Sequence, residues 1–195
     1  MGHQGPRAHT NSMFSIQSEA SPLIRRFGTK LARIASTRPI LDVACGSGRN
    51  AIAMAQLGCA VTCMDRDLTG LDCVLQRLHQ TSFLDVTKRI TAMKLDLALD
   101  RWPFGPRTVS GIINVHFFLP QLFQCFESSL HPGGFLVFET VPGCGGNYLE
   151  LPKTGQVRGA LEPYFDFEYY KERTVGPRNC DSVTVQTVAR RKASC

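Results

Sequence analysis

The sequence lacks the patterns that mark membrane-spanning and secreted proteins. No apolar run approaches the roughly 18 residues that cross a bilayer, and the first residues, MGHQGPRAHTNSMF, lack the apolar core of a signal peptide. Gly2 is followed by Pro6 where a myristoylation motif needs Ser or Thr. We therefore expect a cytoplasmic protein with no membrane partner.

The eight cysteines lack the spacing of a metal site or of a disulfide framework. None forms a CxxC pair, and none stands at zinc-ligand spacing from a histidine. Cys45, Cys59, Cys63 and Cys73 lie in or beside apolar segments, as small buried hydrophobic residues of a reducing compartment do. The sequence therefore predicts no bound metal.

Acidic residues are fewer than basic ones, 16 against 22, and the net charge is +6. Much of the excess lies in two basic clusters, within residues 25–33 and 190–192. Such clusters can bind nucleic acid or attract anionic substrates, but most are solvated surface. We therefore expect no nucleic-acid partner, and the sequence gives no indication of an oligomeric state.

With 195 residues the chain is long enough for one hydrophobic core and short for two. Residues 1–18 are polar and predict a flexible N-terminal segment, which leaves 19–195 as a single domain. The sequence SPLIRRFGTKLARIAS predicts a helix, with Ser21 as its N-cap and Pro22 in its first turn. We expect this helix to pack on a sheet; a lid over a ligand is the alternative.

Strands and helices alternate along the middle of the chain. The expected strands are 40–44, 60–65, 89–96, 111–117 and 135–140, and the expected helices are 50–57, 68–80 and 120–130. A short helix within 151–164 and two strands, 165–174 and 182–191, are expected to follow. The pattern predicts an α/β fold: a doubly wound, Rossmann-like sheet of seven mostly parallel strands, with helices on both faces and an antiparallel C-terminal strand.

The stretch PILDVACGSGRN, residues 39–50, is the most informative part of the chain. It predicts a buried strand, a tight turn and the start of a helix, the arrangement of a nucleotide-binding loop. Gly46 and Gly48 allow the sharp turn and the close approach of a ligand, which a Cβ would obstruct. Asp42 would repel a pyrophosphate, whereas it suits a cationic or amine-bearing ligand.

Two further aspartates end the next two expected strands. In an open α/β sheet ligands bind at the carboxyl ends of the strands. Asp65, which follows Gly48 by 17 residues, can accept hydrogen bonds from both ribose hydroxyls. Asp96 can accept from an adenine amino group, and Leu97 can offer its backbone N–H to the ring. Each aspartate alone is as often a turn or cap residue, but three at successive strand ends favour a shared site.

Two other functions are compatible with part of this pattern. The run from Gly46 to Ala51 also satisfies the GxGxxG/A pattern of NAD(P)-binding oxidoreductases, in which Asp65 would bind the ribose and Arg49 would be favourable. Asp42 speaks against a pyrophosphate there, and the chain leaves no room for a separate substrate domain. A catalytically inactive module that binds a cofactor or RNA is a third possibility.

Several segments resemble the class I S-adenosylmethionine-dependent methyltransferases, over residues 39–192. They are LDVACGSGRN, the acid in VTCMDRD, LDLALDRWPF, INVHFFLPQLF and LHPGGFLVFET. A finer similarity is to the small methyltransferases grouped with tellurite-resistance proteins. It rests on three features: GSGRN, HFFL followed by PQLF, and FET followed by NYLELPKTGQVR. The chain departs from the class at Gly111, where an acid commonly opens the fourth strand.

The resemblance implies S-adenosyl-L-methionine as cofactor and direct transfer of its methyl group to a small-molecule acceptor. The cofactor-binding residues it implies are Asp42, Ala44, Cys45, Gly46, Gly48, Asn50, Asp65, Arg66, Asp96, Leu97 and Asn114.

The acceptor side is less defined. His116 is the candidate catalytic base, because imidazole titrates near neutral pH; a packed histidine is the alternative. Glu139 is a second candidate for which a structural role is favoured. Phe117, Phe118 and Tyr148 line either an acceptor pocket or the core, and the loop 142–147 is expected to shape that pocket. Whether O, N, S or a metalloid accepts the methyl group stays open.

Overall fold

The structure is a computed structural model that describes residues 19–35, 38–80, 83–142, 150–178 and 180–193. The flexible segment predicted over residues 1–18 therefore lies outside the described residues. The same holds for Tyr148 and for residues 143–147 of the predicted acceptor loop.

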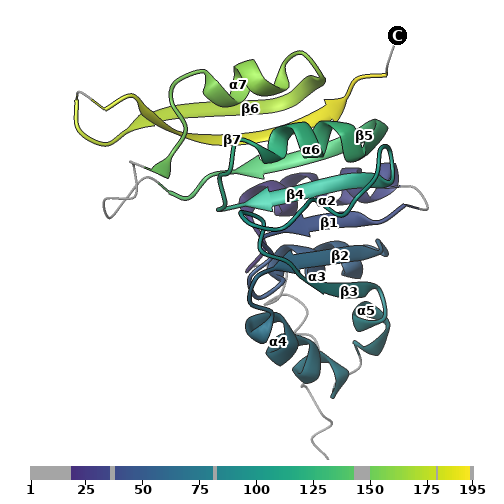
Figure 1. The fold of residues 1–195 in the computed structure, drawn as a ribbon. Coiled ribbons are helices and arrows are strands. Elements are labelled where there is room, and N and C mark those ends of the chain that lie inside the picture. The colour runs from purple at the N-terminus through teal and green to yellow at the C-terminus, as the bar shows by residue number, and fades with distance from the viewer. Residues whose placement is uncertain (1–18, 36–37, 81–82, 143–149, 179, 194–195) are drawn as a thin grey trace, which may run out of the picture.

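One mixed sheet organises the fold (Figure 1), with the strand order β3-β2-β1-β4-β5-β7-β6. The strands are β1 Ile40–Val43, β2 Val61–Asp65, β3 Ile90–Lys94, β4 Val109–Val115, β5 Leu130–Glu139, β6 Phe165–Val175 and β7 Ser182–Arg191. The pairs from β3 to β5 are parallel, and β7 runs antiparallel to both of its neighbours. The predicted fold class, including the antiparallel C-terminal strand, is confirmed.

Helices cover both faces of this sheet. They are α2 Pro22–Ile34, α3 Arg49–Gln56, α4 Thr69–His79, α5 Leu84–Thr87, α6 Leu122–Ser129 and α7 Gln156–Leu161. Side chains of α2, α3 and α4 share one buried cluster with alternate strand residues, and side chains of α6 and α7 share a second cluster with the others. Among the described residues, none of the helices has the length and apolar character needed to cross a membrane.

Most predicted boundaries agree with the structure, and two differ. Helix α5 was not predicted, because a single turn is too short to show a helical period. Residues 131–134, which the sequence leaves between the expected helix 120–130 and the expected strand 135–140, lie within β5 as an irregularity, since Val109 pairs with Leu130 and Gly111 already pairs with Phe135. Ser21 caps α2 as expected, and its Oγ accepts the Ile24 N–H at 3.3 Å.

Gly111 departs from the class I pattern because its neighbour on β5 needs the space. Gly111 and Phe135 are register partners, and a Cβ on Gly111 would overlap the Phe135 ring. Phe135 is fully buried in the centre of the sheet. Where the class commonly has an acid at the start of the fourth strand, this chain therefore has a glycine whose backbone packs against the Phe135 ring.

This packing predicts that Gly111→Ala lowers the free energy of unfolding by about 1–3 kcal/mol, as overpacking in a closed core does. Gly105→Ala is the matched control, because the nearest atom to its added Cβ is Thr108 Cγ2 at 3.8 Å. Denaturant unfolding of both variants tests this, and an equally small loss for the two would contradict the packing argument.

Candidate active site

The polar ends of the parallel strands meet at one edge of the sheet. Asp42 on β1 is the register partner of Cys63 on β2 and of Ile113 on β4, so the three strands end side by side. The glycine turn follows β1, Asp65 ends β2, and residues 114–117 include the end of β4 and the residues after it. The sheet itself therefore brings together residues that are far apart in the sequence.

A cavity of about 260 Å³ opens at this edge, and we call it the Asp65 cavity. Five of the predicted cofactor-binding residues line it: Ala44, Asp65, Arg66, Asp96 and Leu97. Leu95, Ala98 and Phe117 complete the lining. The combination of two carboxylates with apolar side chains suits a ligand that has both hydroxyl groups and a flat apolar ring.

Backbone hydrogen bonds fix both carboxylates of the cavity. Asp65 Oδ2 accepts the Gly46 N–H at 2.9 Å, and its Oδ1 accepts the Asp67 N–H at 3.1 Å. Asp96 Oδ1 accepts the Ala98 N–H at 3.0 Å. Because each carboxylate oxygen can accept more than one hydrogen bond, both groups can still bind ligand hydroxyl or amino groups.

The glycine turn uses its two glycines differently. Gly46 has φ +54°, and a Cβ there would meet nothing within 4 Å, so this glycine leaves open space beside the turn. Gly48 has φ +76°, and a Cβ there would overlap the Leu71 side chain of α4. Ala44 also lies in the left-handed region, at φ 55°, which stores strain at the cavity wall.

Asp42 lies beneath this turn. Its side chain is 1% exposed and does not line the Asp65 cavity. Its Oδ2 accepts the Ala51 N–H at 3.0 Å, so the carboxyl caps the first turn of α3. Burial raises the pKa of Asp42 from 3.8 to about 7, although the Ala51 N–H and the Arg49 guanidinium oppose that rise. Direct contact between Asp42 and a ligand stays a prediction.

Three other predicted residues are buried around the turn. Asn50 Oδ1 accepts the Ser21 N–H at 2.9 Å, which ties the start of α2 to α3 across 29 positions of sequence. Cys45 is 8% exposed. Asn114 at the end of β4 is 2% exposed, and its Nδ2 has no hydrogen-bond partner within the described part of the chain.

His116 sits between two charged side chains. Its Nδ1 lies 3.2 Å from Arg49 Nη2, and its Nε2 lies 4.0 Å from Glu139 Oε1. Because a guanidinium only donates, the neutral imidazole accepts at Nδ1 and carries its proton on Nε2. Burial and Arg49 lower the pKa of His116, against the opposing effect of Glu139, so the ring is neutral at pH 7.

Glu139 continues this cluster toward the other half of the sheet. The side chain is 6% exposed, and Oε1 accepts the Gln186 Nε2–H at 3.0 Å. Its Oε2 is buried and has no hydrogen-bond partner among the residues that the structure describes. A backbone bond of 2.7 Å from the His116 N–H to the Glu139 carbonyl joins the ends of β4 and β5.

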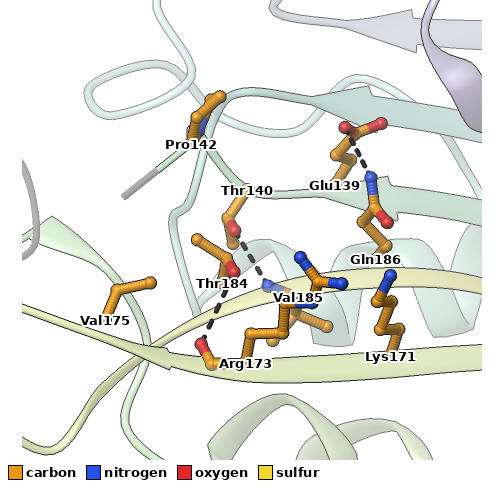
Figure 2. Close-up of a pocket in the computed structure, with 9 residues that line it drawn as sticks. All are labelled: Glu139, Thr140, Pro142, Lys171, Arg173, Val175, Thr184, Val185 and Gln186. Atoms are coloured by element: carbon orange, nitrogen blue, oxygen red, sulfur yellow. Dashed lines mark hydrogen bonds between the residues drawn. The ribbon is translucent and has the colours of Figure 1, made fainter. Parts of the chain in front are cut away.

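Beyond Glu139 lies a second cavity, of about 270 Å³, which we call the Lys171 cavity (Figure 2). Its lining comes from the end of β5, from the residues just after it, and from β6 and β7: Glu139, Thr140, Pro142, Lys171, Arg173, Val175, Thr184, Val185 and Gln186. Apart from Glu139 and the loop position Pro142, these residues carry no signal of a site in the sequence, because they belong to ordinary alternating strands or, for Thr140, follow one directly. Within the described ranges no group of His, Cys, Asp and Glu could hold a metal ion.

The buried carboxyl of Asp42 predicts a pH-dependent stability. The folded protein binds this proton more tightly than the unfolded chain does, so the free energy of unfolding should fall as the pH rises from about 4 to 7. The slope is at most about 1.4 kcal/mol per pH unit. Asp42→Asn keeps an acceptor for the Ala51 N–H and should remove this slope, whereas the exposed control Asp72→Asn should retain it. Unfolding measured at several pH values would contradict the assignment if all three proteins behaved alike.

Comparisons with known proteins bear on the fold that carries this site. Residues 40–134 match a protein family described as a methyltransferase domain. No curated protein matches the sequence. A SAM-dependent methyltransferase from Methanosarcina mazei is 13% identical, with a TM-score of 0.63 over 89% of this chain and 99% of that chain.

Two further solved structures share the fold. TehB from Haemophilus influenzae, a tellurite-resistance methyltransferase, is 16% identical, with a TM-score of 0.62 over 88% of this chain and 64% of its own. The tRNA methyltransferase TrmI from Aquifex aeolicus is 12% identical, with a TM-score of 0.57 over 87% of this chain and 68% of its own. Residues 40–134 thus match a methyltransferase domain, and the chain as a whole has the fold of solved S-adenosylmethionine-dependent methyltransferases.

Proposed function

We propose that this protein transfers a methyl group from S-adenosylmethionine to a small-molecule acceptor. The observation that carries the proposal is the Asp65 cavity, where the acids that end β2 and follow β3 meet the glycine turn. When bound, the cofactor supplies a methyl group on a positively charged sulfur, so the acceptor's lone pair forms the new bond to carbon while the S–C electron pair returns to sulfur.

The cavity residues fit this cofactor. Asp65 has free acceptor capacity for the ribose hydroxyls, and Asp96 and the Leu97 N–H suit the edge of the adenine ring. The open space beside Gly46 leaves room for a ligand to approach the turn. The orphaned Asn114 Nδ2 is a buried donor that needs an acceptor, which a carboxylate of the cofactor would supply.

The remaining predicted residues act on the shape of the turn. Gly48 lets α4 pack against it, and Asn50 anchors α2 beside it. Cys45 fills the space under the turn, and Asp42 holds the start of α3. Arg66 lines the cavity mouth as an exposed cation. These roles are part of the proposal.

The basic clusters support a small acceptor rather than RNA. Arg25 donates to the Ala20 carbonyl, Arg26 lies over the Tyr169 ring, and Lys30 pairs with Glu168 at 2.7 Å. In the second cluster Arg191 pairs with Glu127. Several cations of both clusters therefore have partners within the fold, although the neighbour TrmI shows that the same fold also occurs in tRNA methyltransferases.

We place the protein in the cytoplasm as one domain over residues 19–195. The described residues contribute to a single sheet. The described cysteines are free thiols; Cys45, Cys59 and Cys63 are buried as expected, whereas Cys73, which was expected to be buried, is exposed. Both observations support these two parts of the proposal.

The ribose contact predicts the effect of Asp65→Ala on cofactor binding. Loss of hydrogen bonds to a charged acceptor, each contributing about 1.5–3 kcal/mol, should weaken S-adenosylhomocysteine binding at least about tenfold in calorimetry. Asp85→Ala, an exposed acid away from the cavity, is the control. Undiminished affinity in Asp65→Ala would overturn the assignment, as would failure of the wild type to bind.

We propose His116 as the group that takes the acceptor's proton, at Nδ1, the unprotonated ring nitrogen, which would release the Arg49 guanidinium when it does so. His116→Asn should lower kcat about 10²–10⁴-fold while S-adenosylhomocysteine affinity stays unchanged, because the imidazole lies outside the Asp65 cavity. The wild-type rate should also fall only below about pH 6.5, since the His116 pKa is lowered. Rates of methyl transfer measured across pH test this prediction. If the variant had the same pH–rate profile as the wild type, His116 would have only a structural role.

A further inference from the structure

We propose that the Lys171 cavity holds the methyl acceptor, and that the acceptor is a small molecule with a carboxylate or a similar oxyanion at one end. The inference rests on the function proposed above and names the substrate class for that site. Nothing in the methyltransferase match reaches these residues, because the matched region ends at 134.

The two cavities lie on either side of the same strand ends. Phe117, just after β4, lines the Asp65 cavity, while Glu139, at the end of β5, lines the Lys171 cavity. Val115 and Glu139 are register partners, so these walls are adjacent. His116 stands between them, with its Nε2 4.0 Å from the Glu139 carboxylate. An acceptor in the Lys171 cavity would therefore reach toward a methyl group held at the end of β4.

The alternation of side chains along β6 places two cationic side chains in the wall of this cavity. Lys171 and Arg173 lie on the same face of β6, and Glu172 between them lies on the other. There the Glu172 carboxylate accepts the Tyr170 hydroxyl at 2.6 Å and the Gly155 N–H at 3.1 Å, so it is not available to either cation. Figure 2 shows both cationic side chains extending from β6 into the cavity.

Neither cation is used by the fold. No hydrogen bond or ion pair within the described residues involves the Lys171 ammonium or the Arg173 guanidinium. In the two basic clusters, by contrast, Lys30 pairs with Glu168 and Arg191 with Glu127. Two unpaired cations in one concave site favour a negatively charged ligand group.

The wall of the cavity opposite the two cations, at Glu139, has an unused hydrogen-bond acceptor. Glu139 is 6% exposed, Gln186 occupies its Oε1, and its Oε2 has no partner within the described residues. A buried carboxylate oxygen without a donor is costly, so a ligand hydroxyl, thiol or amino group there would be stabilising. The preferred ligand is thus anionic at the Lys171 end and carries a donor at the Glu139 end. The volume of about 270 Å³ suits a small acid.

The test uses acceptor pairs that differ only in charge: 4-hydroxybenzoate with 4-hydroxybenzamide, and 3-mercaptopropionate with 3-mercaptopropionamide. Binding to the full chain saturated with S-adenosylhomocysteine is measured by calorimetry, and methyl transfer by release of S-adenosylhomocysteine. We expect the carboxylates to bind at least about tenfold more tightly than the amides. Lys171→Gln and Arg173→Gln should each remove a large part of that preference, whereas Arg173→Lys should retain most of it.

Arg33→Gln, an exposed cation on α2, is the matched control and should leave the preference unchanged. Failure of the wild type to bind S-adenosylhomocysteine would overturn the proposed function itself. Normal cofactor binding with no bound carboxylate, or with equal losses for acid and amide in the Gln variants, would overturn only the acceptor class. Methylation of an RNA oligonucleotide that is lost in Arg33→Gln and kept in Lys171→Gln would also reject it.

Discussion

The buried hydrogen bond between the Ala51 N–H and the Asp42 carboxyl fixes the geometry on which the site depends. It joins the middle of β1 to the first turn of α3, so the intervening glycine turn has its two ends fixed. A second bond, from the Gly46 N–H to Asp65, holds the turn against the end of β2. Burial of the Asp42 carboxylate costs free energy at neutral pH, because the charged group loses its hydration on folding. The contribution of this carboxyl is therefore the arrangement of the turn rather than stability.

Much of the fold follows from local sequence patterns. Helical and strand periods place the main elements within a few residues, and the Ser21 cap and the two C-terminal strands are as predicted. Helix α5 and the irregular start of β5 are not predictable in this way. The first is too short to show a period, and the second is set by how residues 109–111 pair with 130–135.

Some residues of the candidate site can likewise be predicted from the sequence, and others cannot. Asp65 and Asp96 can be found from sequence because parallel strands end at a common edge, so their positions relative to the strands are sufficient. The partners of Asn50 and His116 cannot, since Ser21 lies 29 residues from Asn50 and Arg49 lies 67 residues from His116. The Lys171 cavity is harder still, because it depends on the antiparallel pairing of β7 between β5 and β6.

The two halves of this edge of the sheet carry charges of opposite sign. Carboxylates lie at the end of β2 and just after β3, in the cavity proposed for the sulfonium ligand, whereas the unpaired cations lie on β6. His116 and Glu139 occupy the boundary between them, next to the strand ends that separate the two cavities. Such an arrangement attracts a cation to one side and an anion to the other, and it disfavours the reverse order. The positions of the two cavities and the signs of their charges therefore both favour the proposed placement of cofactor and acceptor.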